Sequence, residues 1–172
     1  MDRKEKAEIT TVTLRGLKPG DLGWIAHRQM RIYAEEYGWD WTFEGLVCEV
    51  LGKFVKDFDP LREDAWVAER DGAILGAVFL VKSDDAKIAR LRLLYVEAEA
   101  RGLGLGKRLV RACIARARAL GYAELTLWTN DILYAARKIY FAEGFLLVAA
   151  ERRHAFGCDL VAETWTLNLQ SQ

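Results

Sequence analysis

Three glycines alternate with leucines near the middle of the chain, in the stretch Arg101-Gly102-Leu103-Gly104-Leu105-Gly106. An apolar run, Ile88–Val96, comes before them and predicts a strand. A buried helix face comes after them, with apolar residues at Leu109, Val110, Cys113, Ile114, Ala117 and Leu120. Glycines without Cβ atoms let backbone N–H groups converge, and a helix N-terminus adds partial positive charge. The stretch therefore predicts a strand, an anion-binding loop and a helix, with phosphate as the expected ligand.

The glycine spacing disfavours the common nucleotide-binding loops. The dinucleotide fingerprint G-x-G-x-x-G fails because Leu109 stands where the third glycine would follow Gly104 and Gly106. The phosphate loop of nucleotide triphosphatases fails because Arg101 and Arg108 replace its first glycine and its Ser/Thr. A different class of phosphate ligand is expected.

Hydrophobic periodicity and turn residues place the other elements around this loop. We expect strands at residues 9–14, 65–69, 73–82, 88–96, 123–128, 145–150 and 160–169. Helices are expected at residues 22–37, 42–58 and 132–143, besides the one after the glycines, with Asp21, Thr42 and either Asn130 or Asp131 as N-caps. Hairpins thus mix with strand-helix-strand crossovers. The predicted fold class is α/β, with one mixed, mainly antiparallel sheet of about seven strands and helices on both faces.

Composition indicates one domain, residues 1–172 with a core at about 9–169, because 172 residues with 52% apolar side chains suit a single core. The longest apolar run, residues 73–81, is about half a membrane span, so we expect a cytoplasmic protein with no membrane partner. The chain has three widely separated cysteines, and we expect each of them to be a small buried apolar residue: Cys48, Cys113 and Cys158. The two histidines and the absence of H-E-x-x-H argue against a metal site.

The charges balance overall, with 25 Lys plus Arg against 25 Asp plus Glu, but they are unevenly distributed. Residues 100–123 carry bases and no acid, whereas residues 31–64 are rich in acids. The basic stretch could bind a polyanion, or both stretches could be solvated helix faces. Nucleic-acid binding is the weaker alternative, and we expect no nucleic-acid partner.

Arg101, Gly104 and Gly106 fit the pattern Arg/Gln-x-x-Gly-x-Gly/Ala, which resembles the acetyl-CoA loop of the GNAT superfamily of N-acetyltransferases. The resemblance covers nearly the whole chain, through the order of elements and a downstream pattern of Asn130, Ala136, Tyr140 and Gly144-Phe145. The segments at 33–40, 127–131 and 156–160 resemble the acetyltransferase half of bacterial proteins fused to a MarR-type regulator. One departure is that Asn130 lies ten residues before Tyr140, about three more than is usual in the family.

This resemblance implies that acetyl-CoA is the co-substrate. The cofactor-binding residues would be Leu94, Tyr95, Val96, Arg101, Gly102, Leu103, Gly104, Leu105, Gly106, Lys107, Asn130, Ala136 and Tyr140. A bulge in the preceding strand would let the Val96 N–H polarise the thioester carbonyl, and Tyr140 would protonate the leaving thiolate. Glu97 is a candidate base, with Glu35, Glu36, Asp40, His154, Asp159 or a water chain as alternatives.

The implied reaction is acetyl transfer to a primary amine by direct attack in a ternary complex, and the alternative is a catalytically silent acyl-CoA-binding sensor or interaction module. Aromatic residues interleave with carboxylates at 33–43, which would suit an ammonium group, although the same aromatics could pack one helix onto another. The candidate substrate-binding residues are Tyr33, Glu36, Trp39, Asp40, His154 and Asp159. The acceptor would be a small-molecule or protein amine, and a homodimer is compatible with the family.

Overall fold

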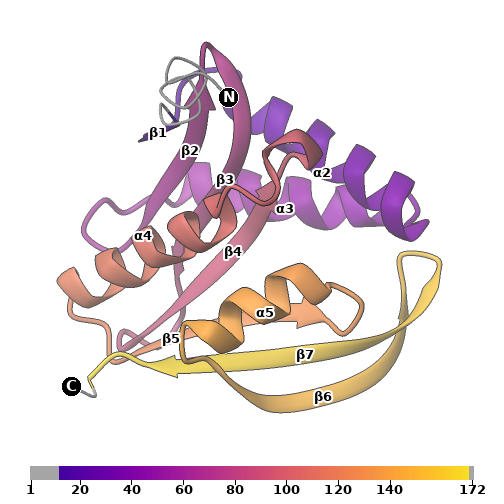
Figure 1. Cartoon of the computed structure of the whole chain (residues 1–172). Helices are drawn as coiled ribbons and strands as arrows, with labels where there is room; N and C mark the ends of the chain where they lie inside the picture. Colours follow the sequence, from indigo (N-terminus) through magenta and orange to yellow (C-terminus); the bar gives the residue numbers. More distant parts are fainter. Residues whose placement is uncertain (1–11, 171–172) are drawn as a thin grey trace.

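The computed structural model describes residues 12–170, which form one seven-stranded sheet with helices on both faces (Figure 1). The strands are β1 (Thr13–Arg15), β2 (Asp64–Arg70), β3 (Ala73–Lys82), β4 (Ile88–Val96), β5 (Glu124–Asn130), β6 (Leu146–Ala155) and β7 (Cys158–Asn168). The helices are α2 (Asp21–Tyr37), α3 (Thr42–Lys56), α4 (Leu105–Ala119) and α5 (Tyr134–Ala142), with a short 3-10 turn η1 (Ala98–Ala100). The predicted fold class and order of elements are confirmed.

The strands lie in the order β1-β2-β3-β4-β5-β7-β6. Among the described strands, β4 and β5 form the parallel pair and the other neighbours are antiparallel. Helix α4 makes the crossover between the two parallel strands, as parallel pairing requires. Figure 1 shows α4 and α5 on one face of the sheet and α2 and α3 on the other.

Each face of the sheet carries its own hydrophobic core. Leu109, Val110 and Phe145 pack on the face covered by α4 and α5. Val47 and Phe79 belong to the core beneath α2 and α3. Because both faces are covered, the central strand β3 is apolar along most of its length, which is why it could be assigned to the middle of the sheet.

Several element ends differ from those expected. The first strand is Thr13–Arg15, and its predicted beginning at residues 9–11 lies outside the described residues. Strand β5 continues to Asn130, and α5 begins only at Tyr134. The prediction that Asn130 or Asp131 caps this helix is therefore wrong, because Leu133 occupies the N-cap and no side chain caps the helix. The carbonyl of Asn130 instead accepts a turn hydrogen bond from the Leu133 N–H.

The outer face of α3 is more exposed than its sequence suggested. Val55 and Phe58 are 55% and 46% exposed, and the helix predicted to reach residue 58 ends at Lys56. Cys48 is also exposed and Cys158 is half-buried, so only Cys113 confirms the expectation of buried cysteines. Burial raises the pKa of the Cys113 thiol, which makes it a poor nucleophile.

Three basic side chains of α4, the helix that follows the glycine stretch, form ion pairs with acidic side chains of other elements. Lys107 and Arg111 form ion pairs with Glu143, and Arg116 pairs with Asp64.

Within residues 12–170, no helix is long and apolar enough to cross a membrane.

Gly76 in strand β3 and Gly52 in helix α3 differ in how much space surrounds them. A Cβ atom at Gly76 in β3 would lie 2.6 Å from the Tyr95 carbonyl oxygen, whereas a Cβ at Gly52 in α3 would meet nothing within 4 Å. We expect Gly76→Ala to lower the free energy of unfolding by about 1–3 kcal/mol. Gly52→Ala should raise it by about 0.5–1 kcal/mol, because alanine favours the helix. Urea unfolding measures both, and an unchanged Gly76→Ala protein would contradict the close approach.

Candidate active site

The two parallel strands diverge halfway along the sheet. Strand β4 pairs with β5 only from Ile88 opposite Glu124 to Leu91 opposite Leu127. Beyond that point β4 continues along β3, and β5 continues along β7. The divergence leaves backbone groups of both strands without a strand partner and opens the sheet between its two faces.

A β-bulge in β4 lies at this divergence. Its register with β3 jumps between Arg92 and Tyr95, and Leu93 has a left-handed backbone with φ 54°. The bulge places Arg92 and Leu93 on the same face of the sheet, because Leu91 and Leu94 pack into the core under α4 and α5 whereas Leu93 packs under α2. Such a conformation is costly for leucine and persists only where the surroundings hold it.

Gln29 of α2 holds the bulge. Its Nε2 donates a 2.9 Å hydrogen bond to the carbonyl oxygen of Leu93, and Gln29 is almost fully buried. Sequence reasoning missed this residue, although a glutamine within the apolar stripe of a helix is a recognisable signal. A buried amide that pairs with a strained carbonyl fixes the local shape of the strand.

The bulge also sets where the neighbouring N–H groups point. The Glu97 N–H donates to Leu75 of β3, and alternate residues of a strand point the same way, so the N–H of Val96 and Leu94 point toward the divergence. The expected bulge lies at Leu93 and Leu94, just before Val96. Leu94 is therefore a second candidate for the thioester donor assigned from the sequence to Val96.

A cavity of about 390 Å³ lies between the end of β4, the C-terminal half of α2, the glycine stretch and the N-terminal ends of α4 and α5. Of the predicted cofactor-binding residues, it is lined by Leu94, Tyr95, Val96, Arg101, Gly102, Gly104, Leu105, Gly106, Lys107 and Ala136. The structure thus brings most of that set together. Leu103 is not among the lining residues, and its side chain is exposed.

The backbone of the glycine stretch fits a phosphate ligand. Gly102 and Gly104 have φ of 80° and 71°, conformations that favour glycine, and Gly104 is the N-cap of α4. A Cβ at Gly106 would lie 2.8 Å from Ile139 Cδ1, so glycine there keeps α5 close to the loop. The first turn of α4 holds no acid, and its free N–H groups face an anion site.

A narrow passage of about 80 Å³ continues from this cavity into the divergence. Tyr33, Leu94, Leu133 and Ala136 line both spaces. Asn130 and Tyr140, two further predicted cofactor residues, line the passage rather than the larger cavity. The passage is the point where the β4 bulge, the end of β5 and the helix α5 meet.

Two polar groups of the passage are unusual. The Oδ1 atom of Asn130 is buried and accepts no hydrogen bond within residues 12–170, so it can accept one from a bound molecule. Tyr140 is also buried, and burial raises the pKa of its hydroxyl well above the ordinary value. The hydroxyl therefore stays protonated at neutral pH, as a proton donor to a leaving group must.

Glu97 does not line either of these spaces. Its carboxylate receives two 2.8 Å hydrogen bonds from Arg28 of α2, through Nε and Nη2, and the glutamate is buried. Both carboxylate oxygens are thus engaged by one guanidinium, and the carboxylate is not placed to meet an amine in either space. The geometry gives Glu97 a structural role in joining α2 to the end of β4.

The candidate substrate-binding residues are not brought together. Tyr33 and Trp39 line the passage, with their rings stacked at 4.9 Å and Trp39 almost fully buried, so these aromatics pack α2 against the loop that follows it. Glu36 lies on the cofactor cavity and pairs with Arg101. The Asp40 carboxylate accepts a hydrogen bond from the Thr42 N–H.

His154 and Asp159, the other two candidates, pair at 2.7 Å on the exposed β6–β7 hairpin. Neither residue lines the passage or the two larger cavities beside it. The remaining candidate base, Glu35, forms an exposed ion pair with Arg31.

A third space of about 510 Å³ opens on the α3 side of the sheet, and sequence reasoning missed it. It shares Leu46, Arg92 and Trp128 with the passage. The passage therefore lies between the cavity at the glycine stretch and the space on the α3 side, and it shares lining residues with each of them. No group of three or more metal-ligating side chains occurs within residues 12–170.

This combination of a glycine-cradled helix N-terminus, a strand bulge and a passage between diverging strands agrees with the comparison to known families. The model of the acetyltransferase (GNAT) family matches residues 26–145. The chain belongs to the GNAT family of acetyltransferases. It is therefore an acyltransferase, and the resemblance inferred from the glycine spacing is confirmed at the level of the family.

Among curated proteins, this GNAT chain is 33% identical over 113 residues to an uncharacterised N-acetyltransferase of Schizosaccharomyces pombe, covering 66% of this chain and 69% of that protein. It is 37% identical over 112 residues to human N-acetyltransferase 8, covering 62% of this chain and 49% of the human protein. Over 84 residues it is 38% identical to human N-acetyltransferase 8B, covering 46% of this chain and 37% of that protein. The chain thus spans half or less of the length of these human relatives.

Solved structures show the same fold. The Salmonella typhimurium protein yncA, solved with its cofactor acetyl-CoA, superposes with a TM-score of 0.71 at 19% identity, covering 95% of this chain and 96% of that one. An N-acetyltransferase from Staphylococcus aureus Mu50 superposes with a TM-score of 0.72 at 20% identity, covering 94% of this chain and all of that one (100%).

The Arg28–Glu97 pair gives a prediction that separates stability from catalysis. Glu97→Gln should lower the free energy of unfolding by about 1–3 kcal/mol, because it weakens two charge-assisted hydrogen bonds. The pH dependence of kcat should keep its shape, because Glu97 is paired with Arg28 and lines neither the cavity nor the passage. Urea unfolding and kcat between pH 6 and 10 measure the two effects. The loss of the acidic limb of the pH profile in this variant would instead make Glu97 the proton acceptor.

Proposed function

We propose that this chain transfers an acetyl group from acetyl-CoA to a primary amine by direct attack in a ternary complex. The observation that carries the proposal is the passage lined by Tyr140 and Asn130, which shares lining residues with the cavity at the glycine stretch. Direct attack needs both reactants at one point, and the passage offers that point. A covalent acyl-enzyme is disfavoured because the thiol of Cys113 is buried in the core beneath α4.

The cofactor-binding residues are those of the larger cavity. The N–H groups from Gly102 to Lys107 would hold the pyrophosphate, and Leu94 to Val96 would bind the pantetheine arm through their backbone. Bound acetyl-CoA supplies the activated thioester. The Leu94 or Val96 N–H would polarise its carbonyl, because both point into the divergence, and such preorganised donors stabilise a developing oxyanion.

Tyr140 would donate the proton that the departing thiolate needs. Tyr140 lines the passage together with Asn130, whose buried Oδ1 has no partner within residues 12–170 and would accept an amine or amide N–H. No carboxylate lines the passage, so we assign removal of the amine proton to water rather than to Glu97. The proton is lost to solvent through the opening on the α3 side.

The proposal also covers the domain organisation of the chain, its location in the cell and its partners. We treat residues 1–172 as a single acetyltransferase domain that acts in the cytoplasm, with no nucleic-acid or membrane partner. A homodimer and the resemblance to the acetyltransferase half of bacterial MarR fusions stay predictions. The curated relatives described above come from a yeast and from human, and their names carry no such fusion.

Tyr140 and Tyr134 offer a matched pair for testing the acid. Both lie on α5, but Tyr134 is 65% exposed. We expect Tyr140→Phe to lower kcat by about 10²- to 10⁴-fold and to leave the Kd for CoA within about twofold. Tyr134→Phe should leave both unchanged. Thiol release and calorimetric CoA binding measure these quantities. Full activity of Tyr140→Phe would exclude the assigned acid, and CoA binding without turnover in the parent chain would favour a sensor.

Gly104 tests the phosphate cradle. Gly104→Glu places an acid beside the helix N-terminus, whereas Gly104→Ala imposes the same backbone strain at φ 71° without the charge. We expect the Glu variant to bind CoA at least about 10-fold more weakly than the Ala variant, with similar thermal midpoints for the two proteins. Equal binding of CoA by both variants would contradict a phosphate site at this loop.

A further inference from the structure

Three arginines from two strands surround the space on the α3 side. Arg90 and Arg92 lie two residues apart on β4 and share one face, and Arg153 approaches from β6. The Arg153 guanidinium carbon lies 5.3 Å from the centre of the Trp128 ring, which also lines the space. The cavity of about 510 Å³ is large enough for a small organic molecule.

None of these arginines is neutralised by the protein. Within residues 12–170, no ion pair of 4.0 Å or less involves Arg90, Arg92 or Arg153. The bases of α4, in contrast, find acids on neighbouring elements. Repulsion among unpaired like charges destabilises the folded protein, and a bound anion would offset that repulsion.

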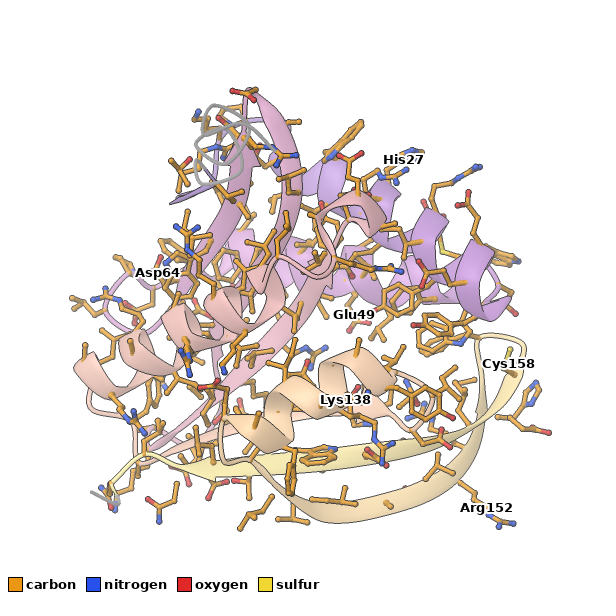
Figure 2. The ribbon with its side chains drawn as sticks, viewed as in Figure 1. His27, Glu49, Asp64, Lys138, Arg152 and Cys158 are labelled. Carbon is orange, nitrogen blue, oxygen red and sulfur yellow. The ribbon has the colours of Figure 1, made fainter. Side chains whose placement is uncertain are left out.

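Arg92 is the most constrained of the three. It is half-buried, and burial together with the neighbouring Arg90 lowers its pKa, while Glu49 of α3 acts in the opposite direction. Figure 2 labels Glu49, the acid that faces this region from α3. Glu49 is exposed and makes no ion pair with Arg92 within 4.0 Å, so the site keeps an excess of positive charge.

Arg92 also connects this space to the reacting groups. It lines both the passage and the α3-side cavity, as do Leu46 and Trp128. Asn130 and Tyr140 line the same passage. Because Arg92 and Asn130 line the same passage, an anion on Arg92 and an amine beside Asn130 would be two groups of one small bifunctional molecule.

We propose that the acceptor is a small amine that also carries an oxyanion, a carboxylate or a phosphonate, and that Arg90, Arg92 and Arg153 bind this oxyanion. The planar guanidinium fork matches such groups with two parallel hydrogen bonds. The proposal rests on the proposed function and specifies the acceptor class. It replaces the expectation of a pocket selective for an ammonium group alone, because Asp40, His154 and Asp159 line neither the passage nor this cavity.

The test compares acceptors of matched size in three groups: free L-amino acids, 2-aminoethylphosphonate, and neutral amines such as ethanolamine and L-amino-acid amides. Thiol release from acetyl-CoA gives kcat/KM for each. We expect at least one carboxylate or phosphonate acceptor to exceed its neutral counterpart by about 10-fold or more. The better of the two anionic groups identifies which oxyanion is used. Equal or higher values for the neutral amines would overturn the inference and leave the acetyltransferase proposal intact.

The arginine variants make the same test from the protein side. Arg92→Gln and Arg153→Gln should each lower kcat/KM for the preferred anionic acceptor by about 10- to 100-fold, mainly through KM, and should lower kcat/KM for a neutral amine by a smaller factor. Arg152→Gln is the matched control, because Arg152 lies next in sequence on the opposite face of β6 and projects away from the protein (Figure 2). An equal loss in all three variants, or none in Arg92→Gln, would overturn the inference.

A binding measurement covers the case in which no amine reacts. The CoA-bound protein is titrated calorimetrically with N-acetylglycine and with its neutral counterpart N-acetylglycinamide. We expect the carboxylate to bind more tightly by about 10-fold and Arg92→Gln to abolish the difference. Absence of turnover with a retained difference would refute the proposed transfer reaction while supporting the anion site. Equal binding of both ligands would refute the anion site.

Discussion

One hydrogen bond in the interior decides the shape of the site. The Gln29 amide donates to the carbonyl of Leu93 and holds a left-handed residue in the middle of a strand. This bulge turns the backbone of β4, after which β4 and β5 no longer pair. The cavity, the passage and the orientation of the Leu94 and Val96 N–H groups all depend on that divergence. Helix α2, which covers one face of the sheet, thus determines the geometry of the passage.

The same bulge explains why the arginines share a cavity. Before it, Arg90 and Arg92 alternate with Ala89 and Leu91, which pack beneath α4. After it, the alternation restarts one residue out of phase, so Leu93 joins the core under α2. The arginines are therefore the last residues of β4 on the α3 side before the hydrophobic core begins. Their position next to the passage follows from the strand register rather than from a loop.

The local parts of the fold could be predicted from the sequence. The strand, the glycine stretch and the helix at residues 88–120 are specified by periodicity and by backbone conformations that glycine permits, and the structure confirms them. Most of the predicted cofactor-binding set lines one cavity, because most of it is contiguous in sequence. The start of α5 was wrong because Asn130, an apparently good cap, was drawn into β5 by its pairing with β7.

The acceptor side could not be predicted, because it depends on contacts between distant elements. Trp39 lies in a loop and was expected to face a ligand; it lines the passage and also packs against Tyr33 and Phe156. Arg90 and Arg92 were readable as two charges on one face of a strand, yet nothing local shows that α3 partly covers that face. Gln29 was hidden for the same reason, since its partner lies 64 residues away. Tertiary context alone distinguishes these polar groups from solvated ones.

The passage lies between two larger spaces, one at the glycine stretch and the other beside α3, and each would serve as a mouth. Cofactor and acceptor would then enter from different sides, and neither would block the way of the other. A single-mouthed pocket enforces an order of addition, whereas a two-mouthed one does not. The consequence is kinetic independence: spent CoA and acetylated product could leave in either order, and a slow step at one mouth would leave exchange at the other untouched.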